Sequence, residues 1–146
     1  MTSHPKPAPS PRALVTGGSG YFGELVVRAL LARNYRVRVL DLVDVPDRPS
    51  QVEFVRGDIR DARLVTDACA GVDVVHHNVA QVPLAKDRDL FESVNVGGAR
   101  NLFEACRSSG VRKVVNVSSS AVFGVPPRNP VDATIAPRPQ EAYGRA

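Results

Sequence analysis

The sequence predicts an α/β fold in which a doubly wound parallel sheet is covered by helices. Five short apolar segments alternate with segments of helical periodicity, and each apolar segment is hydrophobic enough to be buried on both faces. The first of them runs directly into a cluster of glycines that opens a helix. Right-handed crossovers then favour the strand order 3-2-1-4-5, with strands numbered along the chain.

The composition is that of an ordinary globular domain. The chain has 146 residues, of which 43% are hydrophobic and 23% charged, so neither disorder nor a coiled coil is expected. The net charge is +4, but the basic residues are scattered and only 5% of residues are aromatic, which argues against nucleic-acid binding. No apolar run comes near the ~20 residues that span a bilayer, so we expect a cytosolic protein without a membrane segment.

The first part of the chain predicts an arm, a strand and a helix. Residues 1–11 are rich in proline and predict a disordered arm, which leaves 12–146 as the folded domain. Arg12 to Thr16 is a short apolar run and predicts a buried strand. A helix is predicted over Phe22 to Arg33, with Asn34 as a left-handed cap. The apolar spacing of this helix is carried by Phe22, Leu25, Val26, Ala29, Leu30 and Ala32.

The same periodicity predicts the remaining elements. Further strands are expected over 36–41, 52–56, 72–76 and 113–117, and helices over 61–70 and 89–109. Prolines break the stretch between the second and third strands, which is too short for a full crossover helix. Beyond Val117 the chain is rich in proline, and a helix that starts at Gln140 has no room to finish.

The cysteines and histidines do not predict a metal site. Cys69 and Cys106 fall within predicted helices and lack CxxC or histidine-rich spacing, so we expect core-facing thiols in a reducing compartment. His76 and His77 are adjacent, and neighbouring strand residues point to opposite faces. No metal is therefore expected.

Three glycines follow the first strand at the spacing of a dinucleotide-binding turn. Gly17 permits a tight turn, Gly20 lets the backbone approach a pyrophosphate, and Gly23 lets the helix pack closely on the strand. The N-terminus of the helix then faces the anion. Strand, turn and helix together predict a Rossmann-like cofactor site, although such glycines also occur in plain structural turns.

Acidic residues at the ends of the second and third strands predict the choice of cofactor. Asp41 can accept hydrogen bonds from ribose hydroxyls and repels a 2′-phosphate, so NAD is favoured over NADP. Arg36 and Arg38 keep NADP open as an alternative. Asp58 is predicted either at the adenine rim or as the cap of the next helix.

Polar residues also occur at one position expected in the core and at another expected at the carboxyl edge of the sheet. Asn95 shares a helical stripe with Phe91 and Gly98, so its amide must find partners, either in helix packing or in an active site. Ser119 and Ser120 follow the fifth strand at the carboxyl edge of the sheet. Hydroxyls there can polarise a substrate oxygen or simply form a turn.

Four motifs together resemble the extended short-chain dehydrogenases, also called NAD-dependent epimerases/dehydratases. They are the glycine turn after Thr16, the terminal Asp41, Gly57-Asp-Ile59 after the third strand, and Val94-Asn-Val-Gly-Gly98 in the long helix. The resemblance covers nearly the whole chain beyond Pro11. It implies an NAD-binding domain from an enzyme of hydride transfer.

The resemblance also implies the residues of the site. Ser119 aligns with the catalytic serine or threonine of the family, with Ser120 as the alternative. Tyr143 begins a Tyr-x-x-x-Lys motif whose lysine, which activates the tyrosine, would be residue 147, so Tyr143 alone is expected to be an inefficient base. The segment His77 to Ala80 corresponds to the family's H-x-A-A beside the nicotinamide ribose, and Val79 departs from that pattern. The implied cofactor-binding residues are Gly17, Gly20, Tyr21, Phe22, Gly23, Asp41, Asp58, Ile59, Asn78, Val79, Ala80, Asn95 and Val117.

The predicted parent enzyme is an NAD-dependent epimerase or dehydrogenase/reductase that acts on a secondary alcohol or ketone. A nucleotide sugar is the expected substrate, and a steroid or flavonol-like alcohol is the alternative. Ser119-Ser-Ala121 replaces the T-D-E triplet of 4,6-dehydratases, which argues against water elimination. A non-catalytic NAD sensor is the other alternative. We also expect a homodimer in the full-length protein and exposed apolar surface where its C-terminal substrate region is missing here.

Overall fold

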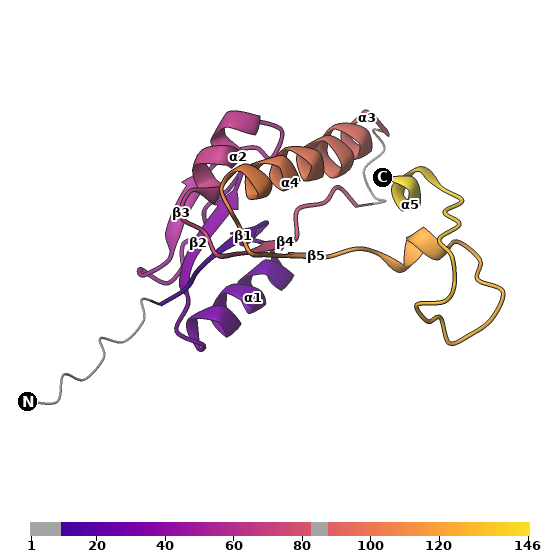
Figure 1. Ribbon diagram of the computed structural model, residues 1–146, viewed down its shortest axis with the longest axis horizontal. Coiled ribbons are helices and arrows are strands. Elements are labelled where there is room, and N and C mark those ends of the chain that lie inside the picture. The colour runs from indigo at the N-terminus through magenta and orange to yellow at the C-terminus, as the bar shows by residue number, and fades with distance from the viewer. Residues whose placement is uncertain (1–9, 83–87) are drawn as a thin grey trace, which may run out of the picture.

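The computed structural model describes residues 10–82 and 88–146, so most of the predicted N-terminal arm lies outside the described residues. A five-stranded parallel sheet with the order β3-β2-β1-β4-β5 forms its centre (Figure 1). The predicted fold class and strand order are confirmed. The strands are β1 (Arg12–Thr16), β2 (Arg36–Asp41), β3 (Glu53–Arg56), β4 (Val74–His77) and β5 (Lys113–Asn116).

Helices cover both faces of the sheet. α1 (Tyr21–Leu31) lies on one face, and α2 (Ala62–Cys69) and α4 (Ala99–Ser108) pack together on the other (Figure 1). Residues 42–52 form no crossover helix, as their prolines predict. None of the helices in the two described stretches has the length and apolarity that a membrane crossing needs. The shorter helices are α3 (Arg88–Leu90), η1 (Phe91–Gly98), η2 (Ser120–Phe123) and α5 (Ala142–Arg145).

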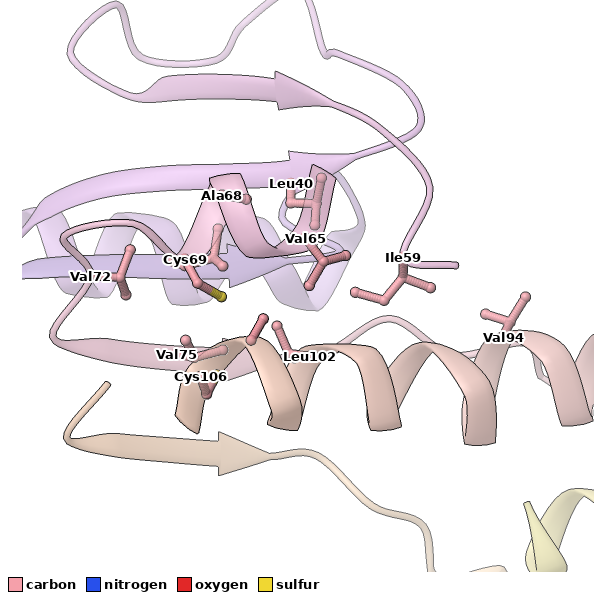
Figure 2. Packing of buried hydrophobic residues seen from close by; sticks show 12 residues of the cluster. Leu40, Ile59, Val65, Ala68, Cys69, Val72, Val75, Val94, Leu102 and Cys106 are labelled. Atoms are coloured by element: carbon pink, nitrogen blue, oxygen red, sulfur yellow. The ribbon is translucent and has the colours of Figure 1, made fainter. Parts of the chain in front are cut away.

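The core beneath α2 and α4 consists of aliphatic side chains and the two cysteines. Leu14, Val75 and Leu102 are fully buried there. Cys69 and Cys106 lie in the same cluster as buried, free thiols, as predicted (Figure 2). A second apolar cluster fills the space between α1 and the other face of the sheet. β1 therefore contributes side chains to both cores, because its residues alternate between the two faces.

α1 buries only part of the apolar set that its spacing predicts. Val27 and Leu30 are buried, whereas Phe22 and Leu25 are 53% and 49% exposed. Apolar residues occur on two sides of this helix, and close packing of Gly23 against the preceding turn fixes which side meets the sheet. Among the described residues, nothing covers the second apolar side.

The long helix predicted over 89–109 is present as α3, η1 and α4 in succession, but its middle section is a π-helix. Gly98 lies so close to the segment after β3 that a Cβ there would be 2.5 Å from Ile59 Cγ2. π-helical turns are rare and frequently occur at functional sites. The spacing of apolar residues does not distinguish a π-helical turn from an α-helical one, because both kinds of helix can present one buried side.

Arg38 lies in the core instead of near the carboxyl edge of the sheet. Its Nη1 donates to Ala68 O at 2.5 Å and to Ala70 O at 3.2 Å, and so satisfies carbonyls at the end of α2. Its Nε lies 2.9 Å from Glu53 Oε1, as an ion pair without an aligned hydrogen bond. Arg36, at the opposite edge of the sheet, donates to Ser10 O at 3.2 Å.

We expect Arg38→Ala to lower the free energy of unfolding by about 2–4 kcal/mol, because two carbonyls lose a buried charged donor and Glu53 loses its partner. Urea unfolding followed by circular dichroism measures this loss. Arg36→Ala, on the same strand but exposed, is the matched control and should stay within about 0.5 kcal/mol of the wild type. Equal stability of the two variants would contradict the structural role of Arg38.

Candidate functional site

Glycines shape the turn between β1 and α1. Gly17 has φ +69°, in the left-handed region that favours glycine, and its N–H donates to Leu40 O at 2.9 Å. A Cβ on Gly23 would lie 2.0 Å from Gly17 O, so only glycine allows α1 to begin this close to the turn. A Cβ on Gly20 would meet no atom closer than 3.6 Å, which leaves this backbone open to a ligand.

The N-terminus of α1 has no side-chain cap among the described residues. Its N-cap residue, Gly20, is extended and makes no side-chain cap hydrogen bond. The first N–H groups of a helix have no acceptor within the helix, and the helix dipole gives them partial positive charge. This end of α1 is therefore suited to an anion such as a pyrophosphate.

Two adjoining cavities lie at the carboxyl edge of the sheet. One, the β3-side cavity, has a volume of about 460 Å³ and lies near the ends of β2 and β3. The other, the β5-side cavity, has about 960 Å³ and lies between α4, the segment after β5 and α5. The strand order reverses at β1, where open α/β sheets form their ligand crevice. The residues that line both cavities are Gly17, Gly20, Asn78, Val79 and Ala80.

Every predicted site residue except Tyr21 lines one of these cavities. Tyr21 is 85% exposed and lines neither of them. Ser120, the alternative to Ser119, is also exposed and lines neither. The β3-side cavity brings together Asp41, Asp58 and Ile59. The β5-side cavity brings together Phe22, Gly23, Asn95, Val117, Ser119 and Tyr143.

The carboxylate of Asp41 is held by backbone donors at the end of β2. Its Oδ2 accepts from Ser19 N at 3.0 Å, and its Oδ1 accepts from Leu42 N at 2.7 Å. The bond to Ser19 ties the glycine turn to the end of the neighbouring strand. Asp41 is thus fixed at the wall of the β3-side cavity while keeping lone pairs for further hydrogen bonds.

Asp58 does not cap the next helix, so that alternative is wrong. Asp61 is the N-cap of α2, and its side chain accepts from the N–H groups of Arg63 and Leu64. The side chain of Asp58 instead pairs with Arg60 at 2.6 Å, and the hydrogen bonds from Arg60 lower the pKa of Asp58 below its usual range. Both partners line the β3-side cavity.

Asn95 and Asn78 differ in how their amides are satisfied. Asn95 Oδ1 accepts from Gln81 N at 2.7 Å and its Nδ2 donates to Gln81 O at 3.1 Å, so η1 anchors the segment after β4. In Asn78 both polar side-chain atoms are buried without a partner among the described residues. An unpaired buried amide is costly, which marks Asn78 as a position for a polar ligand atom.

Ser119 and Tyr143 reach the same cavity from different elements. Ser119 ends the extended segment after β5, and its Oγ accepts from Ala121 N at 3.2 Å at the start of η2. Tyr143 lies on α5, and its ring packs on Phe91 with a centroid distance of 6.0 Å. A hydroxyl and a phenol are thereby available on one cavity wall.

Sequence analysis missed the close contacts of Gly18 and Gly144, and it named His77 as part of a segment without predicting its burial. A Cβ on Gly18 would lie 2.7 Å from both Cγ atoms of Val39, and one on Gly144 would lie 2.5 Å from Ala121 O, where α5 packs on η2. His77 is buried at the end of β4, and burial lowers the pKa of its imidazole to about 4. These contacts join residues far apart in the sequence, so no local pattern signals them.

The parallel sheet, the glycine turn and the cavities at the reversal of strand order define a Rossmann-like domain. More specifically, the chain belongs to the NAD dependent epimerase/dehydratase family, whose model matches residues 13–146. The resemblance that the motifs indicate is thus confirmed.

Similar proteins extend well beyond the length of this chain. The uncharacterized protein y4nG of Sinorhizobium fredii is 52% identical over 92% of this chain and 34% of its own length. Human sterol-4-alpha-carboxylate 3-dehydrogenase, decarboxylating, is 37% identical over 90% of this chain and 36% of its own length. Brucella ovis UDP-glucose 4-epimerase, solved in complex with NAD, superposes with a TM-score of 0.85 at 29% identity, over 93% of this chain and 44% of that chain. The chain spans about a third of the length of the curated relatives it matches.

Proposed function

We propose that this chain forms the NAD-binding part of an epimerase or dehydrogenase/reductase that acts on a secondary alcohol or ketone. The observation that carries the proposal is the pair of adjoining cavities, which share the glycine turn and residues 78–80. NAD consists of two nucleotides joined by a pyrophosphate. Its adenosine half is assigned to the β3-side cavity, its pyrophosphate to the glycine turn and its nicotinamide half to the β5-side cavity.

The residues around the turn fit a pyrophosphate and its flanking riboses. The uncapped N-terminus of α1 offers N–H donors, and Gly20 leaves room for a close approach to the backbone. The unpartnered amide of Asn78 lies where the two cavities meet. A polar ligand atom beside it offsets the cost of its burial.

Charge in the β3-side cavity supports NAD over NADP. A carboxylate at Asp41 accepts hydrogen bonds from ribose hydroxyls and repels a 2′-phosphate. Arg36 and Arg38, the cations that keep NADP open at the sequence level, lie at the opposite edge and in the core. Arg60 lines the cavity but is paired with Asp58.

We expect Asp41→Ala to weaken NAD binding about tenfold and to narrow the preference for NAD over NADP, because a charged acceptor for the ribose is lost. Calorimetric titration with both cofactors measures this change. Asp44→Ala removes a carboxylate three residues away that pairs with Arg48 and lines neither cavity, and it should leave both affinities unchanged. Equal cofactor affinities of the wild type and Asp41→Ala would contradict the proposal that Asp41 binds the ribose.

In the β5-side cavity, Ser119 and Tyr143 are proposed to bind the substrate oxygen. NAD supplies the hydride acceptor or donor when bound. Ser119 donates a hydrogen bond to the substrate oxygen, and Tyr143 exchanges the proton that leaves or joins that oxygen. A nucleotide sugar is the proposed substrate, in line with the similarity to UDP-glucose 4-epimerase. A sterol alcohol is the second candidate, because the human sterol dehydrogenase is 37% identical to the chain.

Turnover assays on the gene product that contains this chain separate these candidates. Absorbance of reduced nicotinamide is followed with NAD and either UDP-glucose or a 3β-hydroxysterol. Interconversion of the sugar without net NADH supports the epimerase, and steady NADH with either substrate supports a dehydrogenase. NAD binding without any turnover favours the non-catalytic sensor. The homodimer and the cytosolic location stay predictions.

A further inference from the structure

Thr16 and His77 form a buried pair at the point where the strand order reverses. They end β1 and β4, and they are direct neighbours in the parallel register of these strands. Their exposed fractions are 0% and 4%. The sequence places His77 at the start of the segment beside the nicotinamide ribose and Thr16 before the glycine turn, but it does not predict that the two side chains meet. In the structure His77 also lines the β5-side cavity.

The two side chains hydrogen-bond across the strand boundary. Thr16 Oγ1 lies 2.6 Å from His77 Nδ1, and the same hydroxyl accepts from Asn78 N at 3.3 Å. The direction of this bond depends on the tautomer of His77. Among the described residues the hydroxyl has no other acceptor for its proton, which favours Thr16 as the donor to Nδ1 and a proton on Nε2. The ring of Phe103 on α4 packs edge-on against the imidazole, with centroids 6.4 Å apart.

The two segments that are common to both cavities start next to this pair. Gly17 opens the glycine turn directly after Thr16, and residues 78–80 directly follow His77. The two segments touch, because a Cβ on Gly17 would lie 3.1 Å from Val79 N. A change in the spacing of Thr16 and His77 therefore changes the spacing of the turn and of residues 78–80.

We propose that Thr16 and His77 are positioning residues that hold the glycine turn and residues 78–80 at the spacing required for NAD. This inference rests on the proposed function of the chain. The bond acts through the backbone on either side of it, and neither side chain is assigned a contact with the cofactor. A plain core role predicts that only stability depends on the pair, whereas a positioning role predicts coupled losses of affinity.

Calorimetric titration with NAD tests the pair in the full 146-residue chain. Thr16→Val, which keeps the shape but removes the hydroxyl, and His77→Phe, which keeps a ring but removes Nδ1, should each weaken NAD binding about tenfold. Thr16→Ser restores the donor and should bind within about twofold of the wild type. The double variant Thr16→Val/His77→Phe should bind no more weakly than either single variant, because both remove the same bond.

Val72→Ala is the control for a general loss of stability. Val72 is buried just before β4, away from the residues that line the cavities. This variant should lose thermal stability while keeping NAD affinity. If Val72→Ala weakens NAD binding as much as Thr16→Val does, the positioning role is overturned. If the wild type binds NAD and both Thr16→Val and His77→Phe bind it equally well, only this inference is overturned. If the wild type does not bind NAD, the proposed function is overturned as well.

Nitrogen-15 chemical shifts of the imidazole provide a readout that does not need NAD. We expect Nδ1 of His77 to show the shift of an unprotonated acceptor and Nε2 that of a protonated nitrogen. Thr16→Val should move the Nδ1 shift, and Thr16→Ser should restore it. A protonated Nδ1 in the wild type would reverse the direction of the bond but would keep the pair. An Nδ1 shift that Thr16→Val leaves in place overturns the pair directly.

Discussion

Gly23→Ala is expected to lower the free energy of unfolding by about 3 kcal/mol or more and to abolish NAD binding. The added Cβ would lie 2.0 Å from Gly17 O and 2.8 Å from Gly18 Cα, which are backbone atoms that cannot rotate away. Either α1 moves off the sheet or the turn opens, and overpacking of this kind against backbone is among the most costly single changes. Thermal unfolding and NAD titration measure the two effects.

Gly20→Ala is the matched control in the same turn. Its Cβ would meet no atom closer than 3.6 Å, and its backbone has φ −80°, so the fold should keep its stability. NAD binding should still weaken, because the methyl group occupies space on the face that both cavities share. Loss of stability in Gly20→Ala, or normal stability in Gly23→Ala, would contradict the division of roles between these glycines.

The stability of the fold is expected to fall by about 3 kcal/mol as the pH decreases from about 6.5 to about 4, on account of His77. Burial lowers the pKa of this imidazole to about 4, so the folded state binds its proton less readily than the unfolded chain. Above pH 6.5 both states are neutral and the penalty is absent. Below that value only the unfolded chain gains the proton, which favours unfolding until the folded state also takes it up near pH 4.

Urea unfolding at several pH values, compared between the wild type and His77→Phe, isolates this contribution. The difference in unfolding free energy between the two proteins should change across this window, since phenylalanine does not titrate. Burial also lowers the pKa of His76, and this smaller contribution is common to both proteins. The pKa of Asp58 is lowered from an already acidic value. The stability that the fold loses when Asp58 is protonated is therefore lost at a lower pH than the contribution of His77. A constant difference between pH 7 and pH 4 would show that His77 is accessible to protons in the folded state.

Much of the architecture could be predicted because its signals are local. The runs at 12–16 and 36–41 have the same bounds as β1 and β2, since short apolar segments of a parallel sheet stand out between turns and helices. Asn34 adopts the left-handed conformation that its place after the helix predicts. Ser119 and Tyr143 meet in one cavity because both follow β5, whose end faces the same edge as the glycine turn.

The roles of Asp58, Asp61 and Arg38 depended on how the helices pack on the sheet. Asp58 and Asp61 are both suited to cap α2, and only the entry of the chain into the helix selects Asp61. Arg38 looks like a surface cation until the end of α2 packs over β2 and its carbonyls receive the guanidinium. In both cases the residue type allows two roles, and the neighbours decide between them.

The sequence by itself determined the order of the strands, the glycine turn and the chemical groups gathered at the carboxyl edge. These follow from periodicity, from turn geometry and from the handedness of the crossovers, which act over short stretches of chain. Only the tertiary structure decided which side of α1 is buried, which glycines have no room for a Cβ, and that Thr16 meets His77. The reason is physical: those properties depend on distances between atoms of strands and helices that are far apart along the chain, and local preference does not encode such distances.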